Sequence, residues 1–305
     1  MNSLDDFVQR HDFPCWCGET KGRVFCRQLF GRRPFVVWRC AACGTHRLLP
    51  RALAEATGAA ELYNNYAIPR PTPQQEHTLE NIALARMHRV GFAFRPGQRV
   101  LDVGCGDGLL LEAICRAHGC TGRGIDVDER RIRHAREHRP HAQFECGLFD
   151  PSQTAGPHDV IIACAVLEHV LDPVGFLRAL AAGLAAGGSI YLLVPNAASL
   201  NYRILRSWWR ELLSIGEHIH LFTPKSLGRC AAAAGLHVAE FDTDHDIGWP
   251  TIEFDSPRNA LVAVWACWRE CVKRICWLAH RRGHGDLLFA RLVAPLHAAD
   301  TTRDL

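Results

Sequence analysis

A glycine-rich turn directly after an apolar stretch constrains the fold of this chain more than any other feature. The apolar run Arg99–Val103 leads into Gly104, Gly106 and Gly108, and a helical pattern begins at once after them. Glycine lets the backbone approach a ligand closely, because no Cβ stands in the way. The N–H groups at the following helix start favour an anionic or carboxylate-bearing ligand. The turn therefore predicts a ligand site, although a tight strand–helix turn that binds nothing would need the same residues.

The spacing of these glycines indicates the kind of ligand. A dinucleotide fingerprint has two residues between its second and third glycines, whereas here only Asp107 stands between Gly106 and Gly108. Asp126 follows about 20 residues further on, at the end of a second strand-like run, where an acid can hydrogen-bond both hydroxyls of a ribose. Asp126 alone would also suit a helix cap. With the glycine turn before it, ribose binding is the favoured interpretation.

Residues 75–195 alternate apolar, strand-like runs with helical patterns, which is typical of a parallel sheet covered by helices. Helices are predicted at Leu109–His118, at 128–139 and from Pro173 onward, where proline suits a first helical turn. The run Ala186-Gly187-Gly188 is predicted to be a turn before the last of five strands. These strands are expected at Arg99–Val103, 122–127, Ala142–Cys146, His158–Cys164 and 189–195. The fold class predicted is a doubly wound, Rossmann-like α/β sheet.

Four further segments follow the glycine turn along the chain, and together with it they form a specific set: HDVIIACAVLEHVLDP, AAGGSIYLLVPN, HIHLFTPKSL and AAAAGLHV. Over about residues 75–245 the chain resembles class I S-adenosylmethionine (SAM) methyltransferases. Within that class it is similar to the ubiquinone-type O-methyltransferases and to bacterial methyltransferases of glycans and secondary metabolites. The resemblance implies a seven-stranded, mostly parallel sheet. Its sixth strand would lie at 236–241, and an antiparallel last strand at 286–293.

The resemblance also implies SAM as the cofactor and a set of residues around it. The glycine turn would pack against the amino-acid part of SAM, Asp126 would bind the ribose, and residues near 163–164 would line the methionine or adenine side. The cofactor-binding residues expected on this basis are Asp102, Gly104, Cys105, Gly106, Gly108, Asp126, Val127, Ala163 and Cys164.

Two histidines are candidates for a catalytic base. Methyl transfer to a hydroxyl requires removal of a proton, and histidine suits this because its unperturbed pKa lies near 6.5. His169 follows the fourth predicted strand and is the first candidate; His218 is the second, with His220 alternating in the same segment. A histidine hydrogen-bonded to the backbone at a helix start is the alternative role for His169. The family has a Glu-x-x-Glu-His run here, but Ala165 stands at the first glutamate, so no metal is expected beside Glu168 and His169.

Paired cysteines near the start of the chain suggest a separate metal site. Cys15 and Cys17 form one pair, Cys40 and Cys43 another, and each pair is followed by glycine. Four thiolates suit tetrahedral zinc, so a structural zinc is predicted, with unpaired core thiols as the alternative. Cys26 and His46 are substitute ligands. Some bacterial methyltransferases of the resembled group have a similar zinc-ribbon-like segment before the catalytic domain.

The same region carries eight basic residues and no acid between Lys21 and Arg51, interleaved with Phe25, Phe30, Phe35 and Trp38. Such a ribbon could bind RNA through phosphate contacts and base stacking, hold a phosphorylated substrate, or pack on the catalytic domain. The net charge of the whole chain is only +3, so no global field marks a nucleic-acid binder.

We expect a zinc-ribbon-like module at 1–51, a linker at 52–74 and a methyltransferase domain at 75–305. Amphipathic, tryptophan-bearing inserts at 197–216 and 257–282 would border the active site, either as a lid or as an interfacial membrane-docking surface. No apolar run approaches the roughly 20 residues of a membrane span, and no secretory signal opens the chain. With 14 cysteines, these features favour a reducing, cytoplasmic location, with peripheral membrane contact as a further expectation.

The predicted activity is methyl transfer from SAM to a small-molecule acceptor, with a hydroxyl of a glycan, quinone-like compound or secondary metabolite as the expected group. Two alternatives stay open. One is an RNA methyltransferase that uses the basic ribbon, and the other is a SAM-binding protein without catalysis. The acceptor and the oligomeric state do not follow from the sequence.

Overall fold

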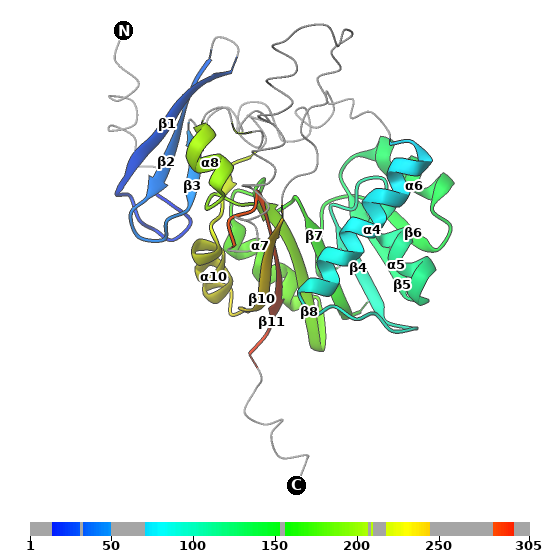
Figure 1. The fold of residues 1–305 in the computed structure, drawn as a ribbon. Coiled ribbons are helices and arrows are strands. Elements are labelled where there is room, and N and C mark those ends of the chain that lie inside the picture. The colour runs from blue at the N-terminus through cyan, green and yellow to red at the C-terminus, as the bar shows by residue number, and fades with distance from the viewer. Residues whose placement is uncertain are drawn as a thin grey trace, which may run out of the picture.

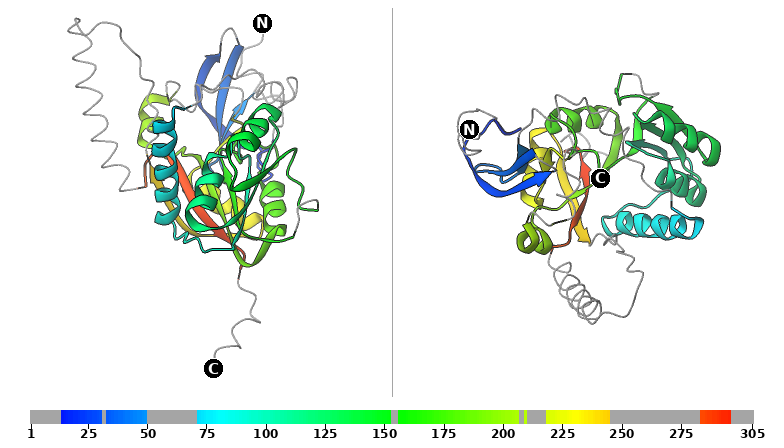
Figure 2. Two further views of the ribbon diagram at one scale, coloured as in Figure 1. Left: turned by 90° about the vertical axis from the view of Figure 1, so that its right-hand side faces the viewer. Right: turned by 90° about the horizontal axis from the view of Figure 1, so that it is seen from above.

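The computed structural model describes residues 14–30, 33–49, 71–152, 156–206, 209, 218–244 and 283–295. Within them the chain forms two sheets, one of seven strands and one of four (Figure 1). The smaller sheet holds the N-terminal segment and lies beside α8 and α10 (Figures 1 and 2).

The large sheet has the order β10-β11-β8-β7-β4-β5-β6. Strands β4, β5, β6, β7 and β8 are parallel, and β11 is antiparallel to both β8 and β10. Their bounds are β4 Arg99–Val103, β5 Thr121–Asp126, β6 Ala142–Cys146, β7 His158–Cys164, β8 Leu184–Pro195, β10 His237–Asp244 and β11 Leu287–Val293. The predicted fold class, including the antiparallel last strand, is confirmed.

Helices cover both faces of this sheet, and strand alternation explains the two buried layers. Val160 and Ile162 of β7 pack in one cluster with residues of α4, α5 and α6. Ile161 and Ala163 pack in the other, with residues of α7 and α10. The helices are α4 Pro73–Arg89, α5 Leu109–His118, α6 Glu129–His138, α7 Pro173–Ala182, α8 Leu200–Leu205 and α10 Pro224–Ala233.

The predicted turn at 186–188 is an irregularity within β8. His158 pairs with Leu184, but Val160 pairs with Ser189, so several residues of β8 are accommodated between neighbouring positions of β7. Gly187 has φ 74°, in the left-handed region that glycine adopts without strain. The glycines thus break the register, while the strand itself begins at Leu184 and not at Ser189.

The small sheet has the order β1-β2-β3-β9, with β1 Gly22–Phe30, β2 Arg33–Cys40, β3 His46–Leu49 and β9 His220–Leu221. Its strands are antiparallel, and β3 pairs with β9 through His46–Leu221 and Arg47–His220. The N-terminal sheet therefore takes its last strand from a segment that follows β8, which the predicted boundary at residue 51 does not include.

Several predicted boundaries fall partly or wholly outside the described residues. Of the expected linker, residues 52–70 lie outside them, and α4 begins at Pro73, where Thr72 and Gln75 form a capping box. Of the two inserts, 257–282 lies outside the described residues, and 197–216 is represented by residues 197–206 and Trp209.

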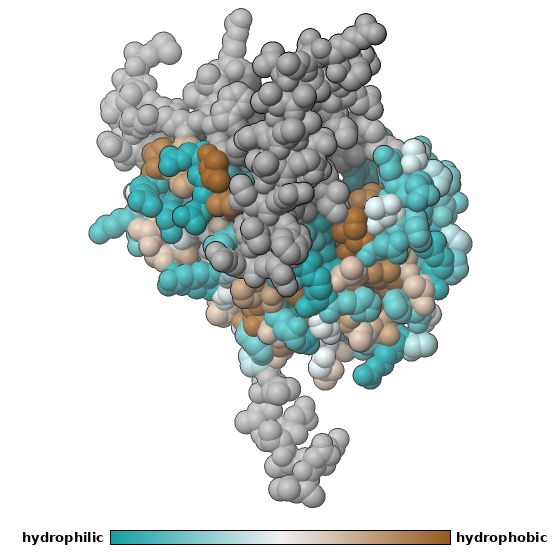
Figure 3. All heavy atoms as spheres, in the orientation of Figure 1, coloured by the Kyte–Doolittle hydropathy of each residue, from teal (hydrophilic) through white to brown (hydrophobic). Residues whose placement is uncertain are grey.

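No helix in the described part of the chain is long and apolar enough to cross a membrane. Where described residues form the surface in Figure 3, hydrophobic side chains lie in separated patches among hydrophilic ones.

Candidate functional site

The glycine turn lies at the carboxyl end of β4, an inner strand of the large sheet between β7 and β5. Gly104, Gly106 and Gly108 all have positive φ, at 75°, 58° and 77°, a conformation that other residues rarely adopt. A Cβ on Gly104 would lie 2.4 Å from Val166 Cγ2, and one on Gly108 would lie 2.5 Å from Phe144 Cε1. Glycine is therefore required at both positions by conformation and by space.

Asp126, the last residue of β5, is tied to this turn. Its carboxylate accepts hydrogen bonds from the backbone N–H groups of Gly106 at 2.8 Å and Asp128 at 2.9 Å, one on each oxygen. The helix cap is supplied instead by Asp128, whose side chain accepts from the N–H groups of Arg130 and Arg131. The cap alternative for Asp126 is thus taken by its neighbour, and each Asp126 oxygen keeps a lone pair for a ligand hydroxyl.

Two exposed apolar side chains flank Asp126. Val127 is 45% exposed, and Leu148, just beyond β6, is 84% exposed. Val127 is on the expected list, whereas Leu148 is not. Leu148 could have been found from its position just after the third predicted strand, because the carboxyl ends of parallel strands meet at the edge of the sheet where ligands bind.

A cavity of about 260 Å³ lies between the glycine turn, the end of β7 and α4. Asp102, Gly104, Cys105 and Cys164 line it, as do Asp107, Leu109 and Leu110; α4 contributes Leu79, Glu80, Ile82, Ala83 and Arg86. Ion pairs hold α4 in place: Arg116 donates to Glu80 at 2.8 Å, and Arg139 donates to Glu76 at 2.6 Å. None of the α4 residues is among the cofactor-binding residues expected from the sequence. This helix precedes the first strand of the large sheet and carries no ligand motif.

The carboxyl group of Asp102 is fully buried against this cavity. Burial, and then the charge of Asp126, raises the pKa of Asp102 to about 7. Removing a carboxylate from water disfavours its charged form, and a like charge adds to the effect. A cationic ligand in the cavity would act in the opposite direction and stabilise the ionised form of Asp102.

Ala163 and Cys164 lie on opposite faces of the sheet. Cys164 lines the cavity, whereas Ala163 is fully buried in the cluster on the α7 and α10 side. Successive side chains of a strand point to opposite faces, so only one of the two expected residues can reach the cavity by its side chain.

His169 and His218 come together beyond the carboxyl end of β7. Their ring centroids are 4.9 Å apart, with the rings inclined by 52°. His169 belongs to a turn that packs on the glycine loop: its N–H donates to Val166 O at 2.9 Å, and Val166 is the residue that a Cβ on Gly104 would strike. Ala165 begins this turn with φ 54°, a strained conformation of the kind that gathers at functional sites.

Backbone hydrogen bonds bring the segment of His218 to that turn. Glu168 O accepts from the N–H groups of Ile219 at 2.7 Å and His220 at 3.0 Å, and Leu48 N–H donates to Ile219 O at 3.2 Å. His220 is itself buried, and its Nε2 lies 3.5 Å from Leu171 O. The position of His218 is therefore set from both sides, by the β7 turn and by β3 of the N-terminal sheet.

Aromatic side chains pack the N-terminal sheet against α8. His46 Nδ1 lies 2.6 Å from the Tyr202 hydroxyl, and Phe25 stacks on Tyr202 with centroids 4.8 Å apart. Burial, and then the charges of Arg39 and Arg23, lowers the pKa of His46 to about 3. A buried, neutral His46 thus forms part of this packing, and it does not join the cysteine cluster.

The sulfurs of Cys15, Cys17, Cys40 and Cys43 all lie within 4.8 Å of one another. Cys15 and Cys43 are separated by 3.6 Å, and Cys17 and Cys40 by 3.7 Å. Hydrogen bonds from Cys15 and then from Thr45 lower the pKa of Cys43 to about 5 despite its burial. Zinc–sulfur bonds of about 2.3 Å in a tetrahedron place sulfurs at such separations, so the four cysteines fit a structural zinc ion. Cys26 packs instead against the cluster that contains Tyr202.

Residues 75–240 match a family model described as "Methyltransferase domain". The chain belongs to this methyltransferase family. It is 31% identical over 176 residues to the ubiquinone biosynthesis O-methyltransferase of Neisseria meningitidis serogroup C, covering 53% of this chain and 74% of that one. It is 32% identical over 160 residues to the Aeromonas salmonicida protein of the same name, covering 49% of this chain and 67% of that one.

The solved structures agree with this assignment at the level of the fold. The complex between the Haloferax volcanii Trm112 methyltransferase activator and the putative methyltransferase matches with a TM-score of 0.52 and 21% identity. The match covers 73% of this chain and 95% of that one.

The cavity and the glycine turn of the methyltransferase can be compared with the chemistry of SAM. SAM is a cation that carries a ribose and a carboxylate. The cavity offers a buried acid in Asp102, the glycine turn offers a helix start, and Asp126 offers two carboxylate oxygens beside it. These features fit SAM, and the chain is a SAM-dependent methyltransferase.

Glu168, His169 and His218 of the methyltransferase also meet the geometric requirement for holding one cation. One ligand atom from each lies within 4.8 Å of the other two. The absence of a metal was expected here because Ala165 replaces a glutamate, and that reasoning did not foresee His218 as a third group. The sequence holds no local signal for this arrangement, because backbone hydrogen bonds from Ile219 and His220 to Glu168 O, about 50 residues away in the sequence, bring His218 there.

Proposed function

We propose that this methyltransferase methylates a hydroxyl oxygen of a small-molecule acceptor, with His169 as the general base and His218 as its partner. The observation that carries this proposal is the pairing of two histidine rings, 4.9 Å apart, where His169 lies on the turn that packs against the glycine loop. A base must lie within reach of the acceptor proton in a site that also aligns the reacting atoms.

The chain's own residues divide the remaining work. The glycine turn and Asp102 would hold the methionine part of SAM, and Asp126 would bind the ribose hydroxyls between Val127 and Leu148. Cys164 would line the same cavity. Bound SAM supplies an electrophilic methyl group. His169 would take the proton of the acceptor hydroxyl, and the neighbouring His218 and the buried Glu168 would orient and stabilise the resulting imidazolium.

The acceptor proposed is a quinone-like compound, a glycan or another secondary metabolite. The relatives at 31% and 32% identity are named for ubiquinone biosynthesis, which favours a ring hydroxyl. Trp209 of the first insert is buried and donates to Asp286 at 2.9 Å. This packing supports the lid interpretation of the first insert over membrane docking. Peripheral membrane docking by the insert at 257–282, which lies outside the described residues, is a second proposal, and a cytoplasmic location goes with both.

The test is transfer of a labelled methyl group. Purified, zinc-containing protein is incubated with methyl-labelled SAM and an extract of its source, and lipid, water-soluble and macromolecular fractions are then separated. Label is expected in an alkali-stable methyl ether within the lipid or water-soluble fraction. The lipid fraction would favour a quinone-like acceptor, and the water-soluble fraction a glycan or free metabolite. Label confined to nuclease-sensitive material, or no transfer to any fraction, would contradict the proposal.

A further inference from the structure

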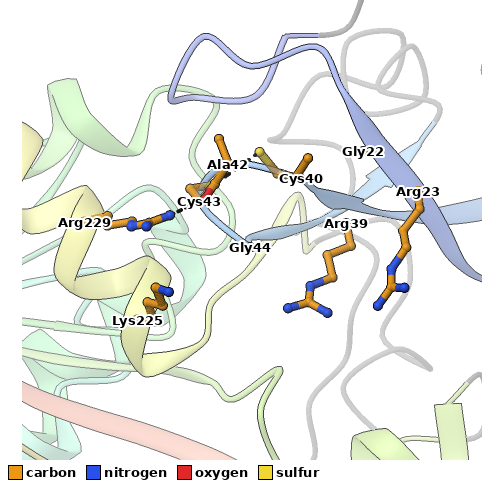
Figure 4. A pocket seen from close by; sticks show the side chains of 10 residues that line it. Gly22, Arg23, Arg39, Cys40, Ala42, Cys43, Gly44, Lys225 and Arg229 are labelled. Carbon is orange, nitrogen blue, oxygen red and sulfur yellow. Dashed lines mark hydrogen bonds between the residues drawn. The ribbon is translucent and has the colours of Figure 1, made fainter.

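A second cavity, of about 460 Å³, lies between the N-terminal sheet and α10, away from the cavity beside the glycine turn. Figure 4 shows Arg23 and Arg39 projecting from the sheet on one side, with Lys225 and Arg229 on the helix on the other. The rest of its lining is formed by Gly22 and the zinc knuckle, residues 40–44. Among the described residues, four cations and no carboxylate line this cavity.

Three of the four cations have no carboxylate partner within the described residues. No ion pair there involves Arg23, Arg39 or Lys225. Arg229 donates to the Ala42 carbonyl, which anchors the zinc knuckle to α10. The knuckle's own N–H groups are used, since Ala41 donates to Lys21 O and Gly44 donates to Cys40 O. A ligand in this cavity would therefore meet side-chain donors.

The cavity lining contains two pairs of neighbouring positive charges. Arg23 and Arg39 are directly paired across β1 and β2, and like charges at such positions are destabilising. Lys225 and Arg229 stand four residues apart on α10, which is also unfavourable for like charges. Both pairs line the same cavity, and an anion bound there would relieve both.

Of the four aromatic residues of the ribbon, the structure describes the side chains of Phe25 and Trp38, and neither of these two is free for base stacking. Trp38 is only 7% exposed and packs with Cys15, Cys40 and Cys43, and Phe25 stacks on Tyr202. Proteins that bind single-stranded nucleic acid combine a basic groove with available aromatic faces. The described residues therefore favour a compact anion over an RNA strand.

We propose that this cavity is a binding site for a pyrophosphate-bearing small molecule. Guanidinium groups bind phosphate oxygens in pairs, and ammonium groups add a point charge. Two arginines and a lysine from facing elements match the charge and the several oxygens of a diphosphate, and the volume leaves room for the group that it is attached to. The site goes beyond the proposed methyl transfer and needs no assumption about the acceptor.

The test uses inorganic pyrophosphate as the probe, titrated by calorimetry into the full-length, zinc-loaded protein. Saturable binding is expected, weakening as salt is raised. Arg39→Ala and Lys225→Ala should each reduce the affinity about tenfold, because each removes a charge-assisted hydrogen bond. Arg39→Lys should retain part of it. Arg133→Ala, at an exposed arginine of α6, is the matched control and should bind as the wild type does.

Zinc content and SAM affinity, measured on every variant, show that the fold is intact without any assay of methyl transfer. Absence of saturable pyrophosphate binding would overturn the proposal. Equal losses in Arg133→Ala and Arg39→Ala would overturn it too. A single-stranded RNA oligonucleotide that binds through Arg39 and Lys225 and is not displaced by pyrophosphate would show a nucleic-acid surface in its place.

Discussion

Cys40→Ser in the full-length protein is expected to release the zinc ion and to lower the rate of methyl transfer at least about 100-fold, while the affinity for SAM changes less than about threefold. The physical reason is a series of hydrogen-bonded strand pairs that connects the cysteine cluster to His218. Cys40 ends β2, β2 pairs with β3, and β3 pairs with β9, next to His218. The groups that would hold SAM lie on the other sheet. Loss of the zinc knuckle should therefore misplace the base and leave the cofactor site intact.

The measurement combines zinc content by mass spectrometry, SAM affinity by calorimetry and transfer of labelled methyl. The matched control is Cys120→Ser, at a buried cysteine outside the cluster whose Sγ lies 3.5 Å from Arg95 O; a serine hydroxyl can keep that contact. Two results would contradict the expectation: a Cys40→Ser protein that keeps its zinc, or a loss of SAM affinity as large as the loss of transfer.

His169→Gln is expected to reduce kcat by about 10²–10⁴-fold, the usual contribution of a positioned base, without changing the affinity for SAM. Glutamine keeps the size and hydrogen bonding of the side chain but cannot take up a proton near neutral pH. His218→Gln should have a smaller effect, about tenfold, because His218 acts through His169.

The rates are measured from pH 6 to 9, where a wild-type rise through the pKa of the base should be lost in His169→Gln. His237→Gln, at an exposed histidine of β10, is the matched control and should keep wild-type rates. Unchanged turnover of His169→Gln across this range would exclude His169 as the base. A wild-type rate that depends on added Mg²⁺, with that dependence lost in His169→Gln and His218→Gln, would instead favour a cation site at Glu168, His169 and His218.

Much of the large sheet could be predicted because its inner strands, such as β4 and β7, are largely buried and read as apolar runs. β4, β6 and β7 begin and end at the predicted residues. The helix after the glycine turn was placed at its observed bounds, and its C-cap is Gly119, in the left-handed conformation. The four cysteines could be grouped because zinc ligation imposes short spacings within each pair.

What the sequence could not supply depends on contacts between distant segments. β9 has two residues and no periodicity, so its pairing with β3 has no local signal. The same holds for α4 as a wall of the SAM cavity and for His218 as a neighbour of Glu168. Each of these features depends on tertiary packing between segments that are far apart in the sequence, so only the three-dimensional structure shows it.

The most direct measurement of the cofactor site is the affinity for SAM of the wild type and of Asp126→Ala, with Glu137→Ala as the matched control at an exposed acid near the end of α6. Asp126→Ala removes the carboxylate between the glycine turn and the proposed ribose position, and two hydrogen bonds to charged groups correspond to a loss of about 100-fold in affinity. The control should bind SAM as the wild type does. If Asp126→Ala binds SAM with wild-type affinity and an unchanged melting temperature, the cofactor does not bind against Asp126, and the site described around the glycine turn is contradicted.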